Sequence, residues 1–172
     1  MNRRPPSHAF RGWASNSDGS AAVEFALVLP LLLLLGLGAL ELGRLFWDYH
    51  IASSSVRDAA RYAARISFNC TTGLDAGVQQ QVVNLTRTGT FNGQGPPLIA
   101  GWTNDSSVSV TVTCNDNTNA TPEILQGPYQ GMAQIPSITV AATVPYTLGF
   151  SGFGGGGGVT SFKVSHQEAW TE

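Results

Sequence analysis

The sequence is poor in charge and lacks the residue clusters that carry enzymatic, metal or nucleotide chemistry. Charged residues make up 12% of the 172, about half the share of a typical soluble domain. Nine lysines and arginines and a formal net charge of −2 argue against the concentrated basic face of a nucleic-acid binder. The three histidines are far apart, and no phosphate-binding loop or grouped catalytic triad is present. We therefore predict no enzyme, no cofactor, no metal site and no nucleic-acid partner.

What the sequence has in place of charge is one long apolar run. The sixteen residues from Phe25 to Leu40 include no charged side chain. Counted from Ser20 to Gly43, the segment has 24 residues. At about 1.5 Å per residue, a helix of that length reaches roughly 36 Å, which is enough to cross the hydrocarbon core of a membrane. We predict a single transmembrane helix over residues 20–43.

A cleaved secretory signal is the competing interpretation of this run. The apolar part of such a signal is shorter than a membrane span, and Gly36-Leu37-Gly38 resembles a weak cleavage site. The helical pattern, however, continues past these residues to about Ile66 without a break. That continuity favours the span.

The charges that flank the run indicate its orientation. Arg3, Arg4 and Arg11 precede it, against the single acidic residue Asp18. Because positive flanks remain in the cytoplasm, we expect the N-terminus inside the cell, the helix in the inner membrane and the C-terminal body in the periplasm. Arginines that follow the span, beginning with Arg44, weaken this bias.

A glutamate lies near the start of the apolar run, where a charge is costly. Glu24 follows Gly19 by five positions, in the string Gly-Ser-Ala-Ala-Val-Glu-Phe that ends at Phe25. A carboxylate at the centre of a membrane helix costs about 2.5–3.5 kcal/mol on insertion scales, and less near an edge. Two interpretations follow: a side chain that reaches up to the headgroups, or one that has a specific partner.

The string from Gly19 to Phe25 resembles the processing motif of the type IV prepilin family. More narrowly, three blocks resemble TadE-like pseudopilins of tight-adherence (Flp) pilus systems: Glu-Phe-Ala-Leu-Val-Leu-Pro at 24–30, Glu-Leu-Gly-Arg at 41–44 and Arg-Asp-Ala-Ala-Arg-Tyr-Ala at 57–63. The resemblance covers residues 19–65, and it is the combination of blocks in this order that carries it.

This resemblance implies a processing site and an assembly residue. A prepilin peptidase would cut after Gly19, so that residues 1–19 are a leader peptide and Ser20 is the mature N-terminus. Glu24, followed by Phe25, would then be the fifth residue of the mature chain. The Ser20 ammonium of one subunit would pair with Glu24 of a neighbour, and this ion pair would offset the burial cost of both charges and set the axial register.

The resemblance further implies partners and a role. The partners are the prepilin peptidase, other pilins or pseudopilins, and the pilus assembly platform in the membrane. The role is that of a minor pseudopilin in a pilus for adhesion and biofilm formation. The alternative is a signal-anchored envelope protein whose β-rich head binds a ligand or partner, with the spacing between Gly19 and Glu24 accidental.

Beyond the span, the helical pattern continues into the exported part of the chain. Over residues 44–66, apolar residues recur at spacings of three and four, which predicts an extension of the same helix. A second stripe, Arg57, Arg61 and Arg65, recurs every four residues and is expected to face solvent.

Residues 67–172 are expected to form an α+β head. A short helix is predicted at 74–88, with Gly89 as its C-terminal cap, and a loop follows it. Strict alternation of apolar and polar residues predicts strands at 107–114, 138–146 and 159–166. These strands would form a small antiparallel sheet with the long helix on one face. A separate small β-sandwich tethered by the helix is the alternative, and the five glycines at 154–158 are expected to be a mobile connection.

A few polar residues in the exported part invite specific interpretations. Cys70 and Cys114 are expected to form one disulfide in an oxidising periplasm, with two free thiols as the alternative. The Ser53–Ser55 run is interpreted as a surface patch and not as a nucleophile, because no nucleophile motif surrounds it. Asn115–Asn117 is interpreted as a polar turn in preference to a calcium loop.

Overall fold

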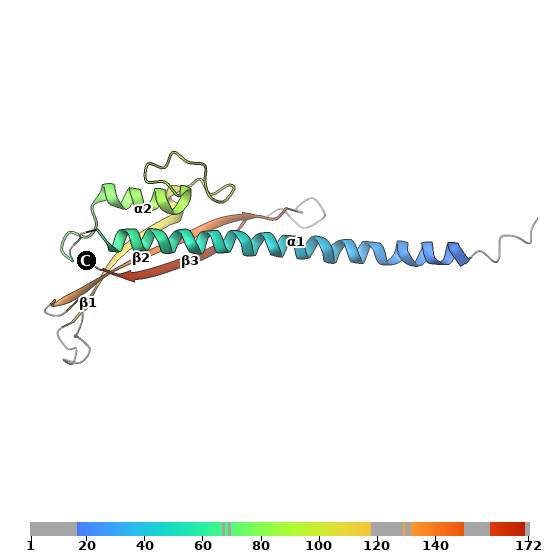
Figure 1. Cartoon of the computed structure of the whole chain (residues 1–172), viewed down its shortest axis with the longest axis horizontal. Coiled ribbons are helices and arrows are strands. Elements are labelled where there is room, and N and C mark those ends of the chain that lie inside the picture. The colour runs from blue at the N-terminus through green and yellow to red at the C-terminus, as the bar shows by residue number, and fades with distance from the viewer. Residues whose placement is uncertain are drawn as a thin grey trace, which may run out of the picture. The chain divides into compact units, whose positions relative to one another are not determined.

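The computed structural model describes residues 17–66, 68, 70–117, 129, 132–149 and 159–170 (Figure 1). The element order is α1, α2, a 3-10 helix η1, and strands β1, β2 and β3. The chain divides into two compact units, residues 1–43 and 44–172. The predicted 154–158 glycine run lies outside the described residues, as does most of the predicted leader.

The described part of unit 1 is the first portion of helix α1, which runs from Ser17 to Ala64 in the chain. Its large apolar side chains are exposed in the described structure: Leu27 is 75% exposed and Leu34 is 69% exposed. Among the described residues this is the one helix long and apolar enough to cross a membrane, with a mean hydropathy of 2.4. An apolar surface of this size needs lipid or other helices around it, so α1 is a candidate single-pass membrane anchor.

Unit 2 is built around a three-stranded antiparallel sheet. Its strands are β1 (Val108–Asp116), β2 (Gln134–Thr147) and β3 (Val159–Ala169), in the spatial order β1-β2-β3. The register pairs Val108 with Ala142, and Ala142 in turn with Val164. Because opposite residues in a ladder point to the same face, the apolar residues of the three strands gather on one side.

The core of unit 2 lies between that apolar face and the helices. Five alanine and valine side chains on the second half of α1 are completely buried: Ala52, Val56, Ala59, Ala60 and Ala63. They belong to one cluster with the sheet residues Ile138, Val140 and Val144 and with Val82 of α2. Burial on one face and exposure of Arg57, Arg61 and Arg65 on the other fix the orientation of this half of α1.

The short helix α2 (Ala76–Thr88) has both of its ends defined by the sequence around it. At the N-terminus the Asp75 carboxylate accepts hydrogen bonds from the backbone N–H of Gly77 at 2.8 Å and of Val78 at 3.4 Å. At the C-terminus Gly89 takes a φ of 70°, a left-handed conformation that favours glycine, and its N–H donates to the Leu85 carbonyl.

The fold class and element order confirm the α+β prediction, and an antiparallel sheet with a helix on one face replaces the β-sandwich alternative. The strands are longer than predicted, most of all β2, because the alternation used to find it breaks at Pro136 and Ser137, both of which are buried. Helix α1 ends at Ala64, two residues before the predicted end, and a turn closes it: the N–H of Ile66 donates to the Ala63 carbonyl at 3.3 Å.

Candidate functional site

The predicted scissile bond lies in the first turn of α1. The described part of α1 begins at Ser17, so Gly19 and Ser20 are its third and fourth described residues.

Nothing in the described part of the chain explains why residue 19 is a glycine. A Cβ atom built on Gly19 meets no heavy atom within 4 Å, and the residue has no positive φ. A larger side chain at this position would fit the fold, with no clash or backbone strain. The described fold sets no requirement for glycine here, whereas a protease cleft that had to accommodate the backbone would.

Glu24 lies one helical turn beyond Ser20 and carries an exposed carboxylate. Two ion pairs are found in the described part of the chain, and neither involves Glu24. The next residue, Phe25, is 60% exposed. An unpaired carboxylate at the edge of an apolar segment is a costly arrangement, so a partner for Glu24 has to come from outside the described part of the chain.

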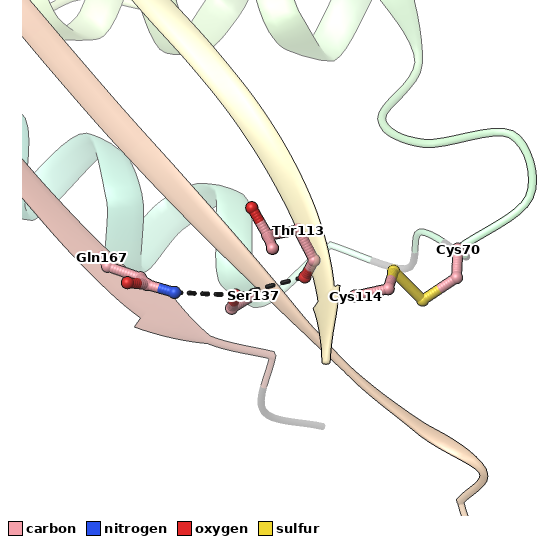
Figure 2. The surroundings of a disulfide bond; sticks show 5 residues. All are labelled: Cys70, Thr113, Cys114, Ser137 and Gln167. Carbon is pink, nitrogen blue, oxygen red and sulfur yellow. Dashed lines mark hydrogen bonds between the residues drawn. A yellow bond between two sulfur atoms is a disulfide. The ribbon is translucent and has the colours of Figure 1, made fainter. Parts of the chain in front are cut away.

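Cys70 and Cys114 lie at disulfide distance, with a Cα–Cα separation of 5.9 Å (Figure 2). Cys70 is on the connection that follows α1, and Cys114 is near the end of β1. The pair therefore ties the connection after the long helix to the end of the sheet, as the sequence predicted. The bridge encloses α2, η1 and nearly all of β1 in one covalent loop.

A short chain of hydrogen bonds next to the disulfide joins all three strands (Figure 2). The Ser137 hydroxyl on β2 donates to the Thr113 carbonyl on β1 at 3.1 Å. The same hydroxyl accepts from the Gln167 amide on β3 at 2.9 Å. Ser137 is only 3% exposed, so both of its bonds replace contacts with water that burial has removed.

Two interpretations of the polar residues are wrong. Ser55 is buried at 7% exposure, and its hydroxyl donates to the Ala52 carbonyl at 2.9 Å. The Ser53–Ser55 run is therefore not wholly a surface patch, because Ser55 falls on the Ala52 face of the helix that packs on the sheet.

The Asn115–Asn117 segment is not a turn, because Asn115 and Asp116 belong to β1 and pair with β2. Asn117 is buried, at 5% exposure, and its amide donates to the Met132 carbonyl at 2.8 Å, which is a structural role directly after β1.

The sequence analysis did not identify the largest buried side chain of unit 2. Trp102 lies in the segment predicted to be a loop, yet it is 0% exposed and its indole N–H donates to the Ser107 hydroxyl at 2.8 Å. The Arg87 guanidinium fixes the same segment, because it pairs with the Asp105 carboxylate and donates to the Thr103 carbonyl. The only signal was the apolar Leu98–Trp102 stretch, which has too few residues to show a period.

Comparison with known proteins finds one similarity. Residues 19–61 match the family model described as TadE-like protein. No curated protein and no solved structure matches the chain. The matched residues contain Gly19, Ser20, Glu24 and Phe25, together with the candidate span and two of the three arginines of the stripe. The match confirms the predicted resemblance of this segment, a quarter of the chain, to the TadE-like proteins of the tight-adherence pilus system.

Proposed function

We propose that this protein is a minor pseudopilin of a tight-adherence pilus system. A prepilin peptidase removes residues 1–19 on the cytoplasmic face, α1 remains in the inner membrane, and the α+β head is exported. The mature chain then joins other pilins at the assembly platform and contributes to a pilus used for adhesion and biofilm formation. Its role is structural and not enzymatic.

The observation that carries this proposal is that the described fold does not require a glycine at position 19. In the described structure no packing contact and no backbone angle requires a glycine there, and the TadE-like match begins at this residue. The described fold does not need this glycine, and it lies in the first helical turn at the start of the matched segment. A processing site would have these properties.

The unpaired carboxylate of Glu24 supports the assembly part of the proposal. Its carboxylate has no basic partner among the described residues of its own chain. Cleavage after Gly19 creates a positive charge on Ser20, one helical turn away from Glu24 in sequence. In a parallel bundle of such helices, the ammonium of one chain satisfies the carboxylate of the next, and both charges leave water as a pair.

The proposal also fits the distribution of polarity along the chain. The apolar part of α1 has no buried side chain in its most hydrophobic window, which suits lipid first and neighbouring helices later. The head has its own core and a disulfide-distance cysteine pair. Disulfides persist in an oxidising compartment, which favours export of this part.

The decisive experiment is to determine the mature N-terminus of the full chain, co-expressed with the matching prepilin peptidase, by mass spectrometry. We expect Ser20 as the first residue. In a Gly19→Leu variant we expect the full-length chain. The matched control is Gly36→Leu, because Gly36 also has open space around its Cβ position and lies in the same helix. That variant should be processed like the wild type.

Other N-termini would contradict the proposal. A chain that begins at Met1 or near Ala39 would favour the signal-anchored envelope protein. Cleavage of Gly19→Leu at the usual bond would show that the glycine is not a determinant and would remove the main support for pseudopilin processing.

A further inference from the structure

One end of unit 2 carries large exposed apolar side chains from two different elements. Phe46 and Trp47, near the start of the α1 portion in this unit, are 69% and 67% exposed. Leu148, directly after β2, is 42% exposed. In the described part of unit 2 the other large exposed apolar residues are Tyr49, Phe91 and Leu98. Tyr49 lies at this same end.

Two contacts establish how the β2–β3 hairpin runs along α1 within unit 2. At one end, the rings of Tyr49 on α1 and Phe162 on β3 lie 5.7 Å apart between centroids. At the other end, Cys70 after α1 is bridged to Cys114, which pairs with Pro136 at the start of β2. The turn end of the hairpin is therefore at the Tyr49 end of this helix portion (Figure 1).

The spacing of the two elements brings Leu148 to the end of unit 2 that contains Arg44. Val144 is the partner of Phe162 in the β2–β3 ladder, and Leu148 lies four residues beyond Val144, or about 13 Å farther along the strand. Arg44, the first residue of unit 2, precedes Tyr49 by five residues, or about 7.5 Å along the helix. Leu148 and Arg44 therefore lie on the same side of the Tyr49–Phe162 contact.

We propose that this end of the head rests on the membrane surface, so that Leu148 forms a second contact with lipid in addition to that of the candidate span. The exposed surface is continuous in sequence with the candidate span, because Phe46 is the third residue after Gly43. Tryptophan and tyrosine are the residues enriched at the headgroup level. A leucine held there exchanges contact with water for contact with acyl chains.

Arg44 is the basic residue at this end. Its side chain is exposed, and it can direct its cation toward lipid phosphates while its methylene groups lie along the apolar boundary. Asp48, between Trp47 and Tyr49, is half-buried. No charged residue follows Leu148 in the sequence before Lys163, so nothing next to it in the chain opposes contact with lipid. The inference rests on the membrane anchor in the proposed function, and it is independent of peptidase processing and pilus assembly.

The test is spin-label accessibility in the full chain reconstituted into phospholipid vesicles. The native cysteines are paired with each other and none is free, so a single introduced cysteine is the only thiol to label. The three positions are Leu148→Cys, Leu98→Cys and Leu33→Cys. Leu98 is the matched control, since it is a leucine of 41% exposure on the loop after α2, and Leu33 reports on the span.

We expect collisions with a water-soluble nickel chelate to be several-fold less frequent at position 148 than at position 98, and collisions with oxygen to be more frequent. The label at position 33 should be protected from the chelate most of all. Equal chelate accessibility at 148 and 98, with 33 protected, overturns the second contact and leaves the anchor intact. If position 33 is as accessible as position 98, the helix is not embedded, and both the anchor and the second contact are refuted.

Discussion

Removal of the Cys70–Cys114 bridge should destabilise the head without changing its fold. The perturbation is the double substitution Cys70→Ser and Cys114→Ser. Cys70 is exposed and Cys114 is half-buried, so serine leaves little cavity and buries little unpaired polar surface at either position. Almost all of the effect should therefore arise from the covalent loop that is lost.

The size of that effect follows from the length of the loop. The two cysteines are separated by 44 positions, for which the chain-entropy model gives a stabilisation of about 4 kcal/mol. Measured values commonly fall lower, so we expect a loss of about 2–4 kcal/mol in the free energy of unfolding. For a chain of this length, each kcal/mol of lost stability lowers the melting temperature by about 3 °C, so the melting temperature should fall by roughly 6–12 °C.

The assay is thermal unfolding of the full chain in detergent micelles, followed by near-ultraviolet circular dichroism, which reports the environment of buried Trp102 in the head core. Reductant should lower the melting temperature of the wild type to that of the double-serine variant, and it should leave the variant itself unchanged. If the variant melts with the wild type, or if reductant has no effect on the wild type, the loop does not stabilise the head and the reasoning fails. Fresh periplasmic material in which both thiols are freely alkylated would contradict the bridge itself.

Three further predictions concern the membrane segment and the core. Glu24→Ala should still be processed but should lose its crosslinks to other pilins. Glu24→Gln should behave the same way, because it keeps the shape of the side chain but not the negative charge that pairs with the Ser20 ammonium of a neighbour. Crosslinking of either variant at the wild-type level would rule out the ion pair. Trp102→Ala should lower the free energy of unfolding by about 3–5 kcal/mol, whereas Trp47→Ala, at an exposed position, should stay within about 0.5 kcal/mol of wild type in urea titrations. Ser137→Ala should cost about 1–2 kcal/mol in the same titrations, since one buried hydroxyl joins three strands; no measurable loss would mean that the bonds form equally well with water.

Features that repeat along contiguous residues could be predicted from the sequence. The apolar run of α1, the buried alanine and valine stripe on its second half, and the alternation in β1 and β2 are local periods. A period of this kind already states which face of a helix or strand is apolar. Gly89 as a cap is local in the same sense, because the residue that can take a left-handed conformation ends the helix that precedes it.

The candidate processing site could also be predicted from the sequence alone. Gly19, Ser20, Glu24 and Phe25 are contiguous or one turn apart, so their arrangement on a helix needs no long-range contact. The structure adds that Gly19 is unconstrained by its own fold and that Glu24 has no partner among the described residues.

Only the tertiary structure decided which separate segments meet. The burial of Trp102, the pairing of Arg87 with Asp105 and the contact of Tyr49 with Phe162 join residues with no shared period. The cost of leaving an indole in water or a guanidinium unpaired is set by whichever segments the compact fold brings beside it. A sequence states the polarity of each residue and of its near neighbours, whereas the partner of a side chain is fixed by the packing of the whole unit.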